Sequence, residues 1–334
     1  MRILVLCLFF ALVLPGAAVA ASSPITEECL VSRAAGASGG ASRLKALVGL
    51  AEWYARSNDT ERAINTYKKA LRENPRRKDA YQVELAIGDT YLGQQQYAQA
   101  IEFYQEAVNL IARSDSAHLR LAKAYEQSEL YELARQEYSG VLKKDKKSFE
   151  ANFGLACLFQ TQGLTGQAME YFRRALMLRP ESNIYRKMAC CAENMGDIDL
   201  AAAMLGQVIA ADRTYEDELS RGRLFDELKK YKESEDAYSQ AIKRDPGRIE
   251  GCFSLGLLYL RNNELMPAEK LLQLALKKAP DEGIIHFFLS AIYYRQHNLP
   301  LARVEIRTAI SLSKSDILAR YSRKFAGMLD AEAK

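Results

Sequence analysis

Apolar residues recur at helical spacing along most of this 334-residue chain, and the pattern itself repeats about every 34 residues. The clearest copy spans residues 249–280. In its first half, four apolar or small residues fall at i, i+3, i+4 and i+7, which places them on one face of a helix: Cys252, Leu255, Gly256 and Tyr259.

The second half of this copy predicts a second helix. Asn262 and Asn263 interrupt the pattern with residues that favour turns. Pro267 stands where a helix can begin with proline, and Pro280 ends the segment. One helix pair cannot bury its apolar face alone, so neighbouring copies must stack. The second apolar face consists of Ala268, Leu271, Leu272 and Ala275.

Eight such copies follow one another over residues 44–316, at 44–77, 81–114, 115–148, 149–181, 182–214, 215–248, 249–282 and 283–316. Seven carry an aromatic residue at the same place in the first helix: Tyr54, Tyr91, Tyr125, Phe159, Phe225, Tyr259 and Tyr293. Seven carry alanine near the start of the second helix, where the sixth copy has Ser234: Ala63, Ala100, Ala134, Ala168, Ala201, Ala268 and Ala302.

This arrangement resembles the tetratricopeptide repeat (TPR), a helix–turn–helix unit of about 34 residues. The resemblance implies an all-α fold, a right-handed TPR superhelix (α-solenoid) of about eight repeats. Residues 317–334 follow the repeats, and their amphipathic part, Ile317 to Asp330, is expected to form a capping helix with a polar outer face.

The first 43 residues differ from the rest of the chain. Residues 1–20 have an arginine, an apolar run from Ile3 to Leu14 and small residues at the end, which is typical of a secretory signal peptide. The apolar run is shorter than the roughly 20 residues that a membrane span needs. We therefore expect export, to the periplasm if the source is bacterial, with no membrane span after cleavage. An N-terminal segment that stays uncleaved and anchors the chain is the alternative. Residues 21–43 are glycine-rich and are expected to be a flexible leader.

Composition narrows the choice of partners. The net charge of +4 is nearly balanced, which disfavours nucleic acid as a partner.

Five cysteines follow the signal segment, an odd number that cannot pair completely within one chain. Cys157 and Cys190 hold the same position on neighbouring first helices, whose axes should lie about 8–10 Å apart, too far for a disulfide. Cys252 is expected to be a small core residue. The five are Cys29, Cys157, Cys190, Cys191 and Cys252.

The sequence does not indicate an enzyme. His118, His286 and His297 form no i, i+4 pair of the kind that binds zinc on one helix. No Gly-x-Ser-x-Gly nucleophile elbow is indicated, because the match at residues 36–40 lies in a glycine-rich stretch that no strand precedes. The repeats occupy most of the chain, so we expect no catalytic residues, no cofactor and no metal.

In the TPR family, positions 2, 5, 9, 12 and 13 of each repeat commonly face a concave surface that binds partners. The resemblance places ten residues of the first two repeats there: Lys45, Val48, Glu52, Ala55, Arg56, Gln82, Leu85, Asp89, Leu92 and Gly93. In repeats seven and eight these positions become mostly apolar with arginine at the edge, which suits a hydrophobic peptide or helix of a protein partner. This candidate site comprises Phe253, Leu257, Leu260, Arg261, Ile284, Phe287, Ala291, Tyr294 and Arg295.

Two alternatives are open for this site: it packs under the helix at Ile317–Asp330, or it mediates self-association. The function indicated is a non-enzymatic protein–protein interaction scaffold or adaptor outside the cytoplasm, for envelope assembly or secretion machinery. A chaperone-like holder of exported polypeptides and a non-catalytic subunit that positions an enzyme are the alternatives. The family's clamp for a C-terminal carboxylate is missing, because Lys45 is followed by Val48, Gly49 and Glu52.

Overall fold

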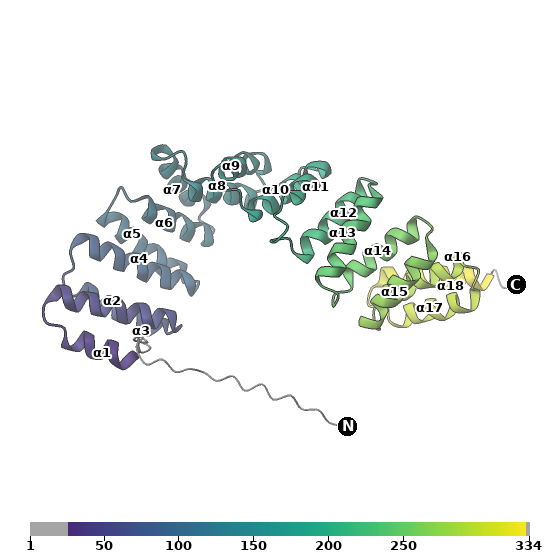
Figure 1. The fold of residues 1–334 in the computed structure, drawn as a ribbon, viewed down its shortest axis with the longest axis horizontal. Coiled ribbons are helices and arrows are strands. Elements are labelled where there is room, and N and C mark those ends of the chain that lie inside the picture. Colours follow the sequence, from purple (N-terminus) through teal and green to yellow (C-terminus); the bar gives the residue numbers. More distant parts are fainter. Residues whose placement is uncertain (1–25, 332–334) are drawn as a thin grey trace, which may run out of the picture. The chain divides into compact units, whose positions relative to one another are not determined.

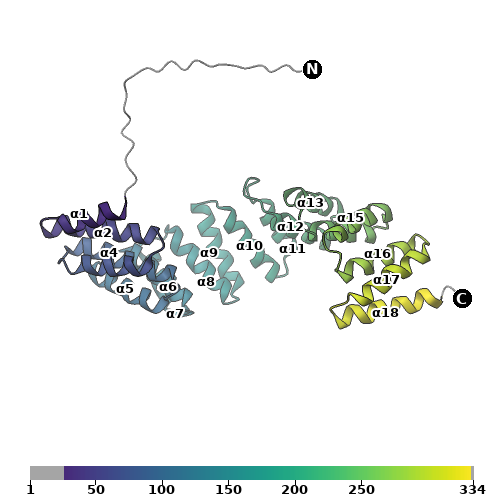
Figure 2. The same ribbon diagram turned by 90° about the horizontal axis from the view of Figure 1, so that it is seen from below.

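The computed structural model describes residues 26–331, and every regular element in that range is an α-helix. The chain divides into two compact units, one ending at Leu130 and the other beginning at Tyr131. Within each unit, successive antiparallel helices pack in pairs (Figures 1 and 2). The predicted all-α helical repeat fold is therefore confirmed.

The first unit holds six helices: α1 (Glu27–Gly36), α2 (Gly40–Arg56), α3 (Thr60–Leu71), α4 (Arg77–Gly93), α5 (Tyr97–Leu110) and α6 (Asp115–Gln127). The step from the first repeat to the second is longer than the others because α4 begins four residues before Tyr81, which adds one turn to its start.

The second unit holds the remaining helices: α7 (Tyr131–Lys144), α8 (Phe149–Thr161), α9 (Thr165–Leu178), α10 (Ser182–Asn194), α11 (Ile198–Gly206), α12 (Tyr215–Glu227), α13 (Tyr231–Arg244), α14 (Glu250–Arg261), α15 (Leu265–Lys278), α16 (Gly283–Arg295), α17 (Leu299–Ser311) and α18 (Asp316–Ala331). Repeat three is shared, because its first helix, α6, belongs to the first unit and its second helix, α7, to the second.

The same turn ends the first helix of all eight repeats. Repeat position 15, counted from the first residue of each repeat, adopts a left-handed conformation with φ between 59° and 76°. The next N–H donates to the carbonyl of position 11, as from Lys230 to Phe225 at 2.8 Å, and so caps the helix end. Only two of the eight residues are glycine, although glycine adopts this conformation most easily. They are Asn58, Gln95, Glu129, Gly163, Gly196, Lys229, Asn263 and His297.

Small residues at position 8 let the two helices of a repeat approach closely. A Cβ added to Gly222 would lie 2.4 Å from the ring of Tyr238, and one added to Gly88 would lie 2.5 Å from the ring of Tyr104. Ser234, which replaces the usual alanine in repeat six, is fully buried, and its hydroxyl donates to the Gly222 carbonyl at 2.8 Å. The close contact between the two helices therefore requires small residues at these positions.

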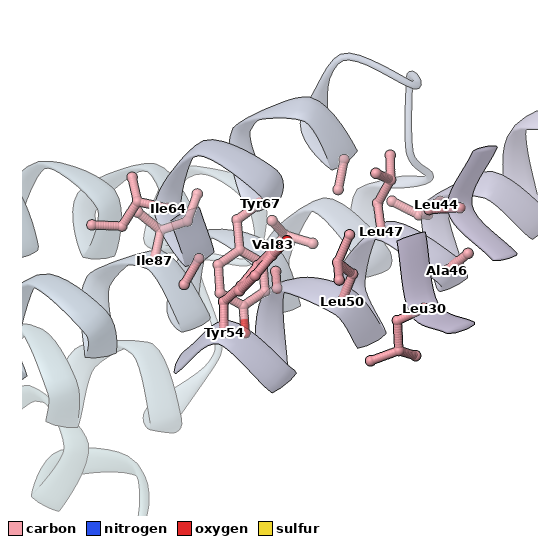
Figure 3. Close-up of a cluster of buried hydrophobic side chains, with 14 residues drawn as sticks. Leu30, Leu44, Ala46, Leu47, Leu50, Tyr54, Ile64, Tyr67, Val83 and Ile87 are labelled. Carbon is pink, nitrogen blue, oxygen red and sulfur yellow. The ribbon is translucent and has the colours of Figure 1, made fainter. Parts of the chain in front are cut away.

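The flexible leader expected at residues 21–43 is wrong for residues 27–36, which form α1, and for residues 40–43, which open α2. Leu30 (Figure 3) and Ala34 of α1 are buried against the first repeat. Glu27 accepts a 2.8 Å hydrogen bond from the Tyr54 hydroxyl. The helix forms because the apolar contacts of Leu30 and Ala34, together with this hydrogen bond, outweigh the low helix propensity of the glycine-rich segment. The signal peptide predicted at residues 1–20 lies outside the described residues.

Repeat five departs from the pattern in its second helix. Helix α11 has nine residues, whereas the second helices of the neighbouring repeats have fourteen. Arg213 donates to the carbonyls of Gly206 at 2.8 Å and Val208 at 3.1 Å, and so satisfies the early helix end. Glu218, almost completely buried, pairs with Arg221 at 2.6 Å next to this segment.

Glu84 is an acidic residue at a repeat position that faces the interior. It holds repeat position 4 in the second repeat, where the first repeat has Leu47. Its Oε2 atom is buried and has no hydrogen-bond partner in the described part of the chain. Burial, and then the charge of Glu106, raise the pKa of Glu84 to about 7.

The turn geometry predicts that Lys229→Gly raises the free energy of unfolding by about 0.5–1 kcal/mol, because glycine adopts the left-handed conformation without crowding of a Cβ. Gly163→Ala introduces that crowding and should lower the free energy of unfolding by about 1 kcal/mol. Urea denaturation, monitored by circular dichroism, measures the free energy of unfolding of both variants. Shifts in the same direction for the two variants would contradict this account.

Glu84 predicts a pH effect on stability. A carboxyl with a raised folded-state pKa keeps its proton in the native state after the unfolded chain has lost it, so stability falls as pH rises from about 4.5 to about 7. The Glu84→Gln side chain stays neutral at every pH. The free energy of unfolding of this variant should therefore exceed that of the wild type by about 2 kcal/mol at pH 8, but by little at pH 4.5. Urea denaturation at both pH values measures this, with Glu102→Gln as the control. A gain that is equal at both pH values would show that the charge of Glu84 is not responsible.

Candidate functional site

The apolar residues predicted for the site lie on α14 and α16. Leu260 is 93% buried and belongs to the core. Ile284 is 39% exposed. The other five are half-buried: Phe253, Leu257, Phe287, Ala291 and Tyr294.

Aromatic rings connect these helices with α18. The ring centroids of Phe253 and Phe288 lie 5.8 Å apart, and those of Phe287 and Phe288 lie 5.4 Å apart. Phe325 of α18 lies 6.0 Å from Phe287 and 5.7 Å from Tyr294. Such distances are typical of favourable edge-to-face and tilted ring pairs. The C-terminal helix therefore packs on part of the predicted site.

Helix α18 also extends the surface that it contacts. Ile317 follows Gly283 by one repeat length of 34 residues, so α18 has the register of a further first helix. Its residues at positions 2, 5, 9 and 12 are all apolar, and Tyr321 and Met328 are 53% and 51% exposed. We call the combined surface the apolar wall: Phe253, Leu257, Ile284, Phe287, Ala291, Tyr294, Leu318, Tyr321, Phe325 and Met328.

A cleft of about 560 Å³ opens in the apolar wall between the beginnings of α16 and α18. Its apolar lining includes Ile284, Phe287, Leu318 and Tyr321, which shows that the two helices present these side chains to one surface. The prediction of a capping helix at Ile317 to Asp330 did not include this contribution to the surface. The 34-residue period, carried one repeat further, would have found it.

The two arginines predicted at the edge of the site have partners in the preceding repeats. Arg261 forms an ion pair with Asp226 and lies over the ring of Tyr231. Arg295 donates to the carbonyl of Leu260 at 2.8 Å. These contacts join one repeat to the next, so the two side chains help to hold the apolar wall in place.

The buried histidine of repeat eight, His286, makes two contacts that stabilise the fold. Its Nδ1 lies 2.6 Å from Oε2 of Glu305, and its Nε2 lies 3.2 Å from the carbonyl oxygen of Pro280. His118 in repeat three makes the corresponding contact with the carbonyl of Ala112 at 3.0 Å. Each side chain thus joins a helix to the end of the helix before it.

No group of three or more His, Cys, Asp or Glu residues between residues 26 and 331 could hold a metal ion. In the same range, no helix has the length and apolar character to cross a membrane. Cys191 and Cys252 are buried, the latter as the core residue predicted, whereas Cys29 and Cys190 are exposed.

The helix pairs and their common turn define a helical-repeat protein. One tetratricopeptide repeat model matches residues 48–118, 187–249 and 253–316. Two further tetratricopeptide repeat models match residues 91–153 and 149–182. The chain belongs to the tetratricopeptide repeat family.

Comparisons with known proteins find similar chains at low identity. The chain is 21% identical over 244 residues to anaphase-promoting complex subunit 3 of Schizosaccharomyces pombe, an alignment that covers 71% of this chain and 31% of that protein. The chain thus spans less than a third of that relative's length. The C-terminal part of a TPR repeat-containing protein from Cytophaga hutchinsonii has a TM-score of 0.63 at 14% identity, covering 71% of this chain and 98% of that one. A tetratricopeptide repeat protein from Parabacteroides merdae has a TM-score of 0.48 at 14% identity, covering 74% and 98%.

The ring contacts predict that Phe325→Ala loosens α18. Loss of contacts with Phe287 and Tyr294 should lower the free energy of unfolding by about 2 kcal/mol. Hydrogen exchange should then show faster exchange in α18 and unchanged protection in α8. Met328→Ala is the matched control, because this side chain is half exposed. Equal effects of the two variants would show that Phe325 does not anchor the helix.

Proposed function

We propose that this protein is a non-enzymatic scaffold that holds an apolar segment of a partner polypeptide against the apolar wall. The observation that carries the proposal is the accessibility of the wall. Ile284, Tyr321 and Met328 are each between 39% and 53% exposed, although they adjoin a packed aromatic cluster. A contiguous exposed apolar surface of this kind typically marks an interaction site.

The wall fits a helix or an extended segment with several large apolar side chains. The cleft of about 560 Å³ has the size of a pocket that can enclose one or two such side chains. Aromatic rings on its floor would make much of the contact, because large aromatic residues commonly dominate interface energies. Neither arginine at the edge is offered to the partner, since both already hold inter-repeat bonds.

We further propose that the chain acts outside the cytoplasm, in envelope assembly or secretion machinery. The support is the composition of residues 1–20, which is that of a secretory signal peptide. Mass spectrometry of the N-terminus of the protein isolated from its native cells tests this. A mature chain that begins at Ala21 would support export with cleavage. A chain that retains residues 1–20 in the membrane fraction would support an anchor.

Partner capture tests the wall. The double variant Ile284→Asp, Tyr321→Asp places charge on the exposed part of the wall and is expected to lose partners that the wild type captures stoichiometrically. The control is Met177→Asp, Val304→Asp, which changes exposed apolar residues of second helices, 80% and 58% exposed, outside the wall. Captured proteins are quantified by mass spectrometry for all three forms.

The outcomes of this comparison are distinct. One or two partners lost only from the wall variant would support the scaffold. Many weakly bound proteins lost in the same way would indicate a holder of polypeptides instead. Equal capture by all three forms would overturn the assignment to the wall. A wild-type dimer that the wall variant cannot form would assign the wall to self-association.

A further inference from the structure

One side of α18, which packs on α17 (Figure 2), differs from the corresponding side of the eight first helices before it. Position 8 is alanine, glycine or serine in all eight repeats, and at Gly88, Gly222 and Gly256 the second helix packs directly against it. Helix α18 has Lys324 at this position. Position 7 is apolar in seven of the eight repeats, whereas α18 has Arg323 there. This side of α18 therefore cannot receive a second helix in the way that the repeats do.

Three cations form a strip on this side of α18. They lie three, four and one residues apart, so they share one face of the helix. All three side chains are exposed, and none of them forms an ion pair or donates a hydrogen bond within residues 26–331. Arg303 of α17 differs from them, because it donates to the carbonyl of Leu329 at 2.7 Å. We call the three residues the basic strip: Arg320, Arg323 and Lys324.

The face that carries the basic strip has an excess of positive charge. Helix α18 holds two acids, Asp316 in its first turn and Asp330 near its end. Asp330 is already paired with an arginine of α17 at 3.6 Å, so Asp316 alone offsets the three cations. Two further acids, Asp281 and Glu282, line the cleft of the apolar wall together with Lys314, and no residue of the basic strip lines that cleft. A partner that covers the basic strip must therefore be anionic.

Exposed apolar side chains lie beside the basic strip. Ile317 is 65% exposed, and Tyr321 and Met328 are 53% and 51% exposed. Because successive helical residues are about 100° apart, all three lie within about 60° of Lys324 around the helix axis. A row of cations next to a row of exposed apolar residues is typical of helices that lie in a membrane interface. Tyrosine is favoured at that depth, because its ring is apolar and its hydroxyl is polar.

We propose that α18 binds the surface of a membrane that contains anionic phospholipids. The cations of the basic strip pair with the phosphate groups of the lipids, and Ile317 enters the boundary between the headgroups and the acyl chains. The helix lies on the membrane and does not cross it. This inference goes beyond the scaffold function and depends on neither the cleft nor the part of the apolar wall on α14 and α16.

Two protein occupants fit this face less well than a lipid surface does. A helix of another protein would meet Lys324 at the position where close helix packing needs a small residue. A second copy of the chain that docked through the same face would bring one basic strip against another, and like charges repel. A lipid surface supplies many phosphate groups and an apolar layer at the same time, which matches both rows of side chains.

Vesicle sedimentation tests the proposal on residues 21–334. Residues 1–20 are left out because their apolar run would itself enter a bilayer, and every described helix lies between Glu27 and Ala331. The probes are vesicles of phosphatidylcholine and phosphatidylglycerol in a ratio of about 7:3, and vesicles of phosphatidylcholine alone. The wild type should bind the anionic vesicles at least about tenfold more tightly than the neutral ones. Added salt should weaken this binding, because it screens the charges.

The strip variant changes all three cations of the basic strip to glutamine. Each cation near an anionic surface strengthens binding about fivefold, so this variant should bind the anionic vesicles about a hundredfold more weakly. Ile317→Ser should weaken binding about tenfold through loss of apolar insertion. The matched control removes the same charge from exposed lysines at the end of α7 and after it, and should bind as the wild type does: Lys143→Gln, Lys146→Gln and Lys147→Gln.

The apolar wall is tested separately. Ile284→Ser changes the wall on α16 without changing the charge and should bind the vesicles as the wild type does. The strip variant should still capture the partners of the apolar wall, so failure at one surface is distinguishable from failure at the other.

Three results would overturn the proposal. The first is equal binding of the wild type to anionic and neutral vesicles. The second is unchanged binding of a strip variant that circular dichroism shows to be folded. The third is a wild type that binds neither vesicle; if the strip variant then loses an acidic protein that the wild type captures, the basic strip belongs to that protein and not to a lipid surface.

Discussion

The contact between the two helices of a repeat is the constraint on which the rest of the structure depends. Position 8 must be small because the side chain at position 24 of the second helix lies directly against it, as Tyr238 lies against Gly222. The left-handed residue at position 15 then returns the chain at the angle that this contact needs. Because each repeat buries its remaining apolar surface only against its neighbours, an error at one contact weakens the adjacent repeats as well.

The core was predictable from the sequence because this contact repeats. Residues such as Ala268, Leu272 and Ala275 are each fully buried, as their spacing predicts. The turn at position 15 was only partly predictable. Asn263 and Gly163 carry a local signal for left-handed backbone, but Lys229 does not, and only its alignment with the other repeats reveals the conformation.

The ends of the repeat array were harder to predict because each depends on few contacts. Helix α1 follows from Leu30, Ala34 and one hydrogen bond to Glu27, a weak signal within a glycine-rich stretch. Helix α18 was expected as a capping helix, and that expectation does not by itself predict which of its residues stay exposed. Phe325 does pack on Phe287, while Tyr321 on the same helix extends the exposed surface. One helix therefore has both roles, and the hydrophobic pattern alone does not separate them.

The concave positions are where the repeats are free to differ, because they take no part in the helix contact that defines the fold. In repeats seven and eight they are mostly aromatic and aliphatic, and the two arginines there join one repeat to the next. In the first two repeats they mix charged and apolar residues. The same two repeats differ in one polar contact, because the Tyr104 hydroxyl donates to Asp89 at 2.7 Å, whereas no such bond joins Tyr67 to Glu52 at the same positions of the first repeat.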